Sequence, residues 1–232
     1  MTNSPDRTRT ETYRSPDQLT DVESYRIELI RKSIHLCSIS IPIFYFYTPQ
    51  TVALAVLAPL ALAFVAVDVA RYYHRPIETW FYKTFGWLLR SRETSKEKKR
   101  LNGATYVLIA ATLAVIIFPK IIAITSFMIL IISDLTAALV GKRLGRHRFL
   151  GKSLEGSVAF FLSALLIVGI LPKVEYRAGE YVIGATASLA GAIVEALPVD
   201  IDDNLSIPLV VGTVLWAGYA LFYPLSNIHK FG

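Results

Sequence analysis

The sequence has few charged residues and a single cysteine, and both shortages exclude classes of protein. Charged side chains make up 18% of the 232 residues and apolar side chains 53%, whereas about 25% of the residues in soluble domains are charged. Intrinsic disorder requires low hydrophobicity and high net charge, so it does not fit this chain. Cys37 has no second cysteine to pair with, which excludes an internal disulfide framework. The mean hydropathy of +0.47 argues against an ordinary soluble domain.

Several catalytic and nucleotide-binding motifs are missing as well. The sequence contains no His-Glu-x-x-His, no paired-cysteine zinc pattern, no Gly-x-Ser-x-Gly and no Gly-x-Gly-x-x-Gly. The segment from Gly145 to Gly151-Lys152-Ser153 comes close to a P-loop, but five residues separate its glycines where that motif has four. A membrane helix, not a strand, is expected before it. We therefore reject a P-loop fold and retain only the chemistry of phosphate binding.

The apolar residues are concentrated in seven runs, and a bilayer-spanning helix needs about 17–25 mostly apolar residues. The runs cover roughly 33–47, 51–70, 103–118, 121–140, 154–171, 181–197 and 207–225. The expected fold class is all-α: a polytopic integral membrane protein with about seven transmembrane helices. Residues 1–21, rich in Thr, Ser, Pro, Asp and Arg, are predicted to be a disordered cytoplasmic tail. Residues 22–232 are expected to form a single transmembrane catalytic domain.

The distribution of Lys and Arg predicts how the chain is oriented. When the segments between the runs are assigned alternately to the two sides, one side collects 20 Lys and Arg residues and the other 4. Positive residues stay in the cytoplasm. We therefore predict a cytoplasmic N-terminus and an outside C-terminus, in an inner or plasma membrane. The same asymmetry accounts for the net charge of +6 without nucleic acid binding.

Residues 76–90 have the pattern of an amphipathic helix. Ile77, Trp80, Phe81 and Phe85 fall at helical spacing, and Pro76 suits the first turn of a helix. We interpret the segment as an interfacial helix on the cytoplasmic face. The alternative is a soluble helix packed on the loop.

Ionisable residues within membrane spans are costly and suggest function by default. Here they gather at the predicted cytoplasmic ends of the spans. Glu28, Arg31, Lys32 and His35 are spaced to form one stripe on a helix that starts near Val22. The other polar residues at this face are Asp68, Arg71, Asn102, Thr105, Asp134, Glu155, Ser157, Glu195, Asp200, Asp202, Asp203 and Asn204. Carboxylates suit a hard cation, while basic side chains and backbone N–H groups suit phosphate.

Each of these residues also has a purely structural interpretation. Arg31 and Lys32 could simply anchor the topology, and His35 could form a hydrogen bond in the core. Asp68 and Arg71 could pair only with each other. Asp134 could form a hydrogen bond between helices, and residues 200–203 could form a solvated turn.

Residues 133–157 form the most specific segment of the sequence. Glycines at positions 141, 145, 151 and 156 allow tight turns and close backbone approach. Five Lys or Arg residues surround them, and Lys152-Ser153 leads into the next helix. The start of a helix favours a bound anion through its dipole and its free N–H groups.

This segment resembles the signature of the CTP-dependent lipid kinases: the dolichol kinases, phytol kinases and CTP-using diacylglycerol kinases, which are related to the phosphatidate cytidylyltransferases. The residues that carry the resemblance are Asp134, Ala137-Ala138, Gly141-Lys142-Arg143-Leu144-Gly145 and Gly151-Lys152-Ser153-Leu154-Glu155-Gly156-Ser157. Supporting patterns lie at 28–35, 68–71, 101–106 and 195–208. The resemblance runs from about residue 25 to residue 225 and is closest to the short, phytol-kinase-like form.

The resemblance implies that the protein binds CTP at the cytoplasmic face. It would use CTP to phosphorylate a polyprenol, a phytol-type isoprenoid or diacylglycerol. The residues expected to act in catalysis are Asp134, His35 and Glu155. The residues expected to bind the nucleotide are Arg31, Lys32, Asn102, Gly141, Lys142, Gly145, Lys152, Ser153 and Gly156. The residues expected to hold Mg²⁺ or another divalent cation are Asp134, Glu155, Glu195, Asp202 and Asp203.

Two other functions remain open at this point. A CTP:phosphatidate cytidylyltransferase would use the same nucleotide to make CDP-diacylglycerol. A transporter or lipid-binding protein without enzymatic activity would place polar residues along a path through the membrane, whereas here they stop at one face. The expected partners are CTP, the lipid alcohol and the bilayer, with a homo-oligomer as a further option and no nucleic acid.

Overall fold

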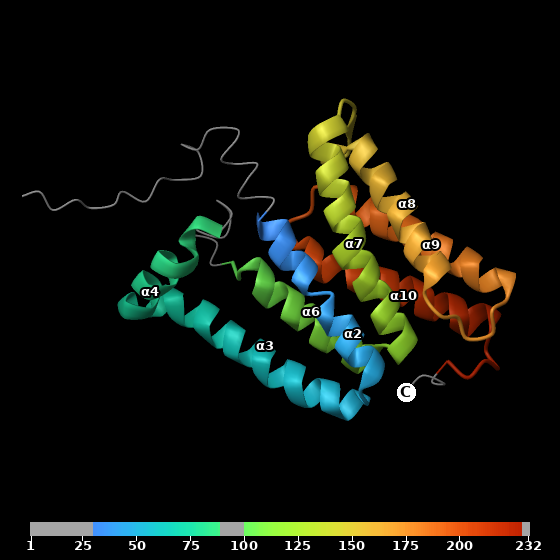
Figure 1. Ribbon diagram of the computed structural model, residues 1–232, viewed down its shortest axis with the longest axis horizontal. Helices are drawn as coiled ribbons and strands as arrows, with labels where there is room; N and C mark the ends of the chain where they lie inside the picture. Colours follow the sequence, from blue (N-terminus) through green and yellow to red (C-terminus); the bar gives the residue numbers. More distant parts are fainter. Residues whose placement is uncertain (1–29, 89–99, 229–232) are drawn as a thin grey trace, which may run out of the picture.

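The computed structural model describes residues 30–88 and 100–228, which are mostly helical (Figure 1). Residues 30–37 are helical and are followed by a turn at 38–39. The elements of the first half are α2 (Ser40–Tyr47), α3 (Gln50–Tyr73), α4 (Arg75–Phe85) and the 3₁₀ turn η2 (Gly86–Leu88). Those of the second half are α6 (Gly103–Ile117), α7 (Lys120–Leu144), α8 (Leu154–Ile170), α9 (Ala178–Ala196) and α10 (Asp203–Phe222). The predicted tail at 1–21 lies outside the described residues.

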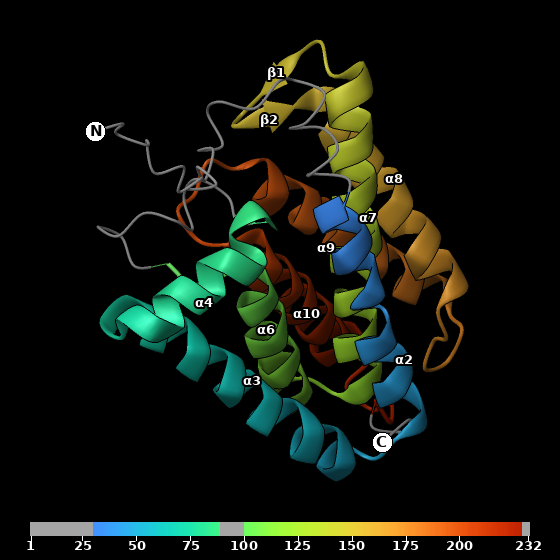
Figure 2. The same ribbon diagram turned by 60° about the vertical axis from the view of Figure 1, so that its left-hand side comes forward.

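A short hairpin between α7 and α8 departs from the all-α expectation. Strands β1 (Arg148–Phe149) and β2 (Lys152–Ser153) pair antiparallel, with Arg148 opposite Ser153. Figure 2 shows the hairpin where α7 ends and α8 begins. It is therefore positioned by two packed helices.

Each of the seven apolar runs coincides with helix in the structure, and local residues account for several of the ends. The first run is divided by the turn at 38–39 into two helical pieces. The side chains of Asn102, Ser153 and Asp202 cap α6, α8 and α10 by accepting hydrogen bonds from backbone N–H groups. Pro49 and Pro119 immediately precede α3 and α7.

Three of these helices are long and apolar enough to cross a membrane: α3, α7 and α10. The apolar helices α6 and α8 are shorter, with 15 and 17 residues. These lengths support a membrane protein, and the count of about seven spans stays a prediction. Within an apolar stretch of 18 residues in each helix, 72% of the residues are buried in α7 but only 22% in α3. Helix α7 is therefore central, while α3 lies at the edge.

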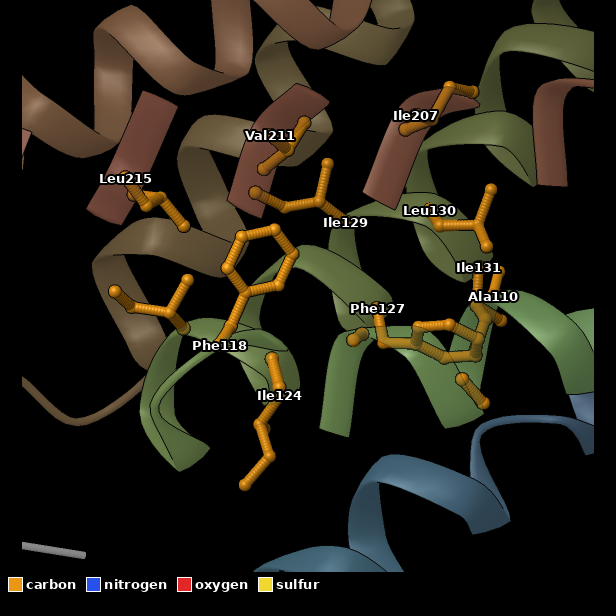
Figure 3. Packing of buried hydrophobic residues seen from close by; sticks show 14 of the residues in the cluster. Ala110, Phe118, Ile124, Phe127, Ile129, Leu130, Ile131, Ile207, Val211 and Leu215 are labelled. Carbon is orange, nitrogen blue, oxygen red and sulfur yellow. The ribbon is translucent and has the colours of Figure 1, made fainter. Parts of the chain in front are cut away.

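The core forms around α7, which packs against α8, α10 and α2. In Figure 3, Phe118 from the end of α6 lies close to Ile129 of α7 and to Val211 and Leu215 of α10. Gly212 makes this approach possible, because a Cβ atom there would lie 2.4 Å from the Phe118 ring. On the other side of the bundle, α3 packs against α6 and α4.

The predicted amphipathic helix is present as α4 followed by η2, and Pro76 lies in its first turn as expected. Phe81 is buried, whereas Trp80 and Trp87 are each about half exposed. Residues 89–90 of the predicted helix lie outside the described part of the chain. The helix therefore has one inward side and one side that carries exposed tryptophans, and its contact with a membrane stays a prediction.

Candidate active site

Lys32 and Asp134 are 102 residues apart in sequence and form an ion pair in the structure. Lys32 lies on the helix at 30–37 and Asp134 lies in α7, and both side chains are largely buried. His35, one turn after Lys32, places its Nε2 atom 4.0 Å from the same Asp134 carboxylate oxygen. The stripe predicted for the first helix therefore faces Asp134 through two of its residues, and Glu28 lies outside the described range.

A second cluster centres on Lys152 of β2. Its ammonium nitrogen lies 2.7 Å from Glu195 Oε1 and 2.9 Å from Asp203 Oδ2. Burial pulls the pKa of Lys152 down, but the two carboxylates outweigh burial and leave that pKa above its ordinary value. The buried Oε2 atom of Glu195 has no hydrogen-bond partner among the described residues. The Lys152 ammonium is also within electrostatic range of Asp134, so the two clusters adjoin.

The glycines of the 141–156 segment allow close packing. A Cβ atom on Gly141 would lie 2.8 Å from Ser153 Oγ, and one on Gly156 would lie 3.0 Å from the Ala137 carbonyl oxygen. The backbone at Gly145 is equally crowded by Ser153. Close approach, one of the two roles predicted for these glycines, is thus confirmed. The tight-turn role is confirmed for Gly151, which lies with Leu150 in the two-residue turn between β1 and β2. The left-handed residue of this turn is Leu150, with φ 52°, and no described glycine has a positive φ.

Glu155 supports the hairpin from the first turn of α8. Its Oε1 atom lies 2.7 Å from Nδ1 of His147 and accepts a hydrogen bond of 3.2 Å from the backbone N–H of the same residue. The His147 side chain is 74% exposed. Sequence reasoning missed His147, although its place eight residues before Glu155 in a Gly-rich turn was a signal for this contact.

Two further predicted site residues cap helices. Asp202 Oδ1 accepts hydrogen bonds from the backbone and the side-chain amide of Asn204. Asn102 accepts one from the Thr105 N–H at the start of α6, while its Nδ2 donates to Asp68. Both side chains therefore have structural contacts, and Asn102 also lines a pocket.

The five predicted metal ligands do not form one group in this structure. Across residues 30–88 and 100–228, no three His, Cys, Asp or Glu side chains come close enough together to hold a metal ion. Glu195 and Asp203 share Lys152, Asp134 pairs with Lys32, and Glu155 and Asp202 contact their own neighbours. The separation follows from packing, because these carboxylates come from four different helix ends.

Asp68 and Arg71 pair with each other in α3 at 3.3 Å, as their structural interpretation predicted, and both side chains are fully buried. Asp68 Oδ2 accepts hydrogen bonds from the backbone and side-chain nitrogens of Asn102 and from Thr105 Oγ1. Arg71 lies 4.5 Å from the centre of the Phe81 ring and donates to the Arg100 carbonyl oxygen. This network joins α3, α4 and the start of α6.

Beside the Lys32–Asp134 pair lies a pocket of about 530 Å³ between the helix at 30–37 and α3, α4 and α6. Most of its wall is apolar, and the polar side chains include those of the first cluster. Its apolar lining comprises Ile34, Phe64, Val67, Trp80, Phe81, Phe85, Gly103, Ala104 and Val107. Its polar lining comprises Arg31, Lys32, His35, Ser38, Asn102, Asp134 and Asn204. Sequence reasoning did not predict this pocket, because it forms between helices that are distant along the chain.

Comparison with known proteins adds to this geometry. An uncharacterised protein of Rickettsia prowazekii is 33% identical over 189 residues, which is 81% of this chain and 92% of the relative. The chain belongs to the same family as this protein. No family model matches the sequence, and no solved structure matches it.

Two further relatives have named activities. A CTP-dependent diacylglycerol kinase of Schizosaccharomyces pombe is 27% identical over 164 residues, which is 64% of this chain and 73% of the relative. A phytol kinase of a Synechocystis species is 32% identical over 110 residues, covering 44% of this chain and 46% of the relative. Their names support the CTP-dependent lipid kinase family and suggest a kinase.

Proposed function

We propose that the protein transfers the γ-phosphoryl group of CTP to the hydroxyl of a membrane lipid alcohol at the cytoplasmic face. The observation that carries the proposal is the position of Asp134. Its carboxylate lines an apolar pocket, where it pairs with Lys32, and it also interacts electrostatically with Lys152 of the hairpin. A lipid acceptor and a nucleotide can thus approach Asp134 from different elements. The names of the relatives support CTP and a lipid as the two substrates.

In the proposed reaction, the lipid hydroxyl oxygen attacks the γ-phosphorus while Asp134 accepts the hydroxyl proton. The bond between the γ-phosphorus and the bridging oxygen breaks, and CDP leaves. Lys32, which pairs with Asp134 in the described structure, would turn to the phosphate oxygens and release the carboxylate for this role. Catalysis of phosphoryl transfer rests mainly on positioning and charge neutralisation. His35 Nε2 lies 4.0 Å from the same carboxylate, beyond hydrogen-bond distance, and would have to move closer to orient it.

The nucleotide phosphates are assigned to the elements around the hairpin. Lys152 supplies positive charge for an anion. At the start of α8, the N–H groups of Leu154 and Gly156 already donate to the His147 carbonyl oxygen and to Ser153 Oγ, so a phosphate would have to displace these contacts to use them. The neighbouring Gly141, Lys142, Gly145, Ser153 and Gly156 complete the proposed site. The close contacts at Gly141 and Gly156 keep the hairpin seated against the end of α7.

A divalent cation fits the Lys152 cluster. Mg²⁺ is usually bound by one or two carboxylates together with substrate phosphates, so three protein carboxylates are not required. Glu195 and Asp203 already converge on one cation, the Lys152 ammonium, and the buried Oε2 of Glu195 is unpartnered among the described residues. Glu195 and Asp203 would hold the ion, which would neutralise charge on the phosphates. Asp134, Glu155 and Asp202 have other contacts in this structure.

The products of the reaction test the proposal. The purified protein in detergent is incubated with CTP and Mg²⁺ and, separately, with phytol, a polyprenol, diacylglycerol and phosphatidate. We expect CDP and a phosphorylated lipid with at least one of the three alcohols. Release of pyrophosphate with phosphatidate would instead identify a cytidylyltransferase. Absence of nucleotide turnover with all four lipids would reject both enzymatic functions.

A further inference from the structure

We infer that the pocket between the helix at 30–37 and α3, α4 and α6 binds the hydrocarbon chain of the acceptor, with the lipid hydroxyl at its Lys32–Asp134 end. The inference rests on the proposed function and assigns to the acceptor a site that the sequence did not reveal. Its volume of about 530 Å³ falls within the roughly 300–1,000 Å³ that is usual for small-ligand sites. The occupant is thus one lipid molecule.

The chemistry of the wall selects an amphiphile. Phe64 and Val67 of α3 face the pocket together with Trp80, Phe81 and Phe85 of α4, so most of the lining is hydrocarbon. Such a surface gains free energy by removing apolar groups from water or headgroups. The polar side chains Lys32 and Asp134 offer a charged donor and an acceptor. A hydroxyl group can donate to the Asp134 carboxylate and accept from Lys32, which fixes the direction in which the lipid enters.

The position of the pocket gives it access to the bilayer. Helix α3 is a candidate membrane span of which only 22% is buried, so most of its surface faces outward. Trp80 of α4 is 55% exposed and Phe85 is 40% exposed, although both line the pocket. Tryptophan is enriched where a membrane meets water. A lipid that lies beside α3 can therefore enter sideways, without crossing a polar surface.

Helix α4 forms an aromatic wall whose side chains contact one another and α3. Phe81 contacts Phe85 with a centroid distance of 5.5 Å, and Trp80 contacts Phe85 at 5.9 Å. Phe81 is held from behind by the Arg71 guanidinium, which is itself paired with Asp68. The aromatic side of α4 is thus held against α3. We assign to Trp80, Phe81 and Phe85 the selection of the chain that fits.

Photolabelling in the absence of CTP tests this site independently of turnover. The purified full-length protein in nanodiscs is irradiated with a single-chain isoprenoid alcohol or a diacylglycerol, each carrying a diazirine in its hydrocarbon part. We expect the labelled residues to map to the pocket lining on α3, α4 and α6. The probe that labels the lining identifies the chain class. Labels confined to outward residues of α3, such as Leu62, would overturn the assignment.

Two substitutions fill the pocket from different helices, and a neighbour serves as their control. Val67→Trp enlarges a lining residue of α3, and Ala104→Phe enlarges an exposed lining residue of α6. Val69→Trp makes the same change two residues further along α3, at an exposed position outside the lining. We expect both filling variants to lower labelling of the lining by tenfold or more, and Val69→Trp to leave it unchanged. Equal labelling in all three folded variants contradicts the inference.

The two proposals can fail separately. If CTP is converted to CDP with a lipid alcohol but pocket-filling variants keep wild-type KM for that lipid, the kinase stands and the pocket assignment is wrong. If the pocket is labelled but no alcohol is phosphorylated, the lipid site stands and the kinase is wrong. Trp80→Ala compared with Trp87→Ala gives a further check, because Trp87 is similarly exposed but does not line the pocket. Only Trp80→Ala should reduce labelling.

Discussion

Replacement of Arg71 by Met tests whether the buried network behind the pocket holds the site together. Asp68 and Arg71 have fully buried side chains. Asp68 Oδ1 forms an ion pair with Arg71 Nε at 3.3 Å and has no hydrogen-bond partner among the described residues. Met keeps much of the apolar length of Arg but removes its charge. Removing one partner of a buried ion pair costs about 3–5 kcal/mol, because the other charge stays in a low-dielectric site.

The structure places the expected loss at the lower end of that range. Asp68 Oδ2 still accepts hydrogen bonds from Asn102 N at 2.9 Å, Asn102 Nδ2 at 2.8 Å and Thr105 Oγ1 at 2.5 Å. These three donors continue to stabilise the carboxylate after Arg71 is gone. The Met side chain can also keep a sulfur–aromatic contact with Phe81. We therefore expect Arg71→Met to lower the free energy of unfolding by about 3 kcal/mol.

Equilibrium unfolding by SDS titration in mixed micelles, followed by tryptophan fluorescence, measures this loss. The control is Arg177→Met, because Arg177 pairs with Glu175 at 2.8 Å but is 67% exposed. Exposed pairs contribute at most about 1 kcal/mol, so this variant should unfold almost as the wild type does. Asp68→Asn added to Arg71→Met removes the uncompensated charge and should restore part of the stability. A loss below 1 kcal/mol for Arg71→Met, or no recovery in the double variant, would refute the reasoning.

Three further substitutions test the site. Asp134→Asn should abolish CDP formation while the protein still inserts and folds. The control is Asp200→Asn, at a side chain that is 82% exposed, which should keep wild-type turnover. Full activity of Asp134→Asn would show that Asp134 has no catalytic role. Lys152→Met should weaken CTP binding tenfold or more in calorimetry, because it removes a cation from the proposed phosphate site. Lys120→Met, at the end of α7 opposite the hairpin, is the control. An unchanged CTP affinity of Lys152→Met would count against the role of Lys152. Gly156→Ala would place a Cβ atom 2.9 Å from Ser153 Oγ and should destabilise by about 1–3 kcal/mol in the same SDS titration. The control is Gly169→Ala on the same helix, where the added Cβ atom meets nothing within 4 Å. This change should raise the free energy of unfolding by up to about 1 kcal/mol. Equal effects of the two changes would contradict the close packing at Gly156.

Helix positions could be predicted from sequence because they depend on neighbouring residues. Long apolar runs become helices wherever backbone groups must bond internally, and α3, α7 and α10 begin and end within a few residues of the predicted runs. That Lys32 and His35 lie on the same side of one helix could also be predicted locally, because residues three apart share one side of a helix.

The partners of the charged residues could not be predicted in this way. Lys152 contacts Glu195 and Asp203, which lie 43 and 51 residues further along the chain. Lys32 likewise pairs with Asp134, which lies 102 residues further along. Spacing along the sequence does not fix such distances, because they depend on how helices that are far apart in the chain pack together.

The sequence by itself determined the helical class, the positions of the helices and the set of polar residues that gather at their ends, because periodicity, capping and apolar length act over a few residues. Only the tertiary structure decided that Lys32 meets Asp134, that Lys152 joins Glu195 to Asp203, and that an apolar pocket opens beside them. The pocket walls come from α3, α4, α6 and the helix at 30–37. Its shape therefore exists only once those helices have packed, and no single segment contains it.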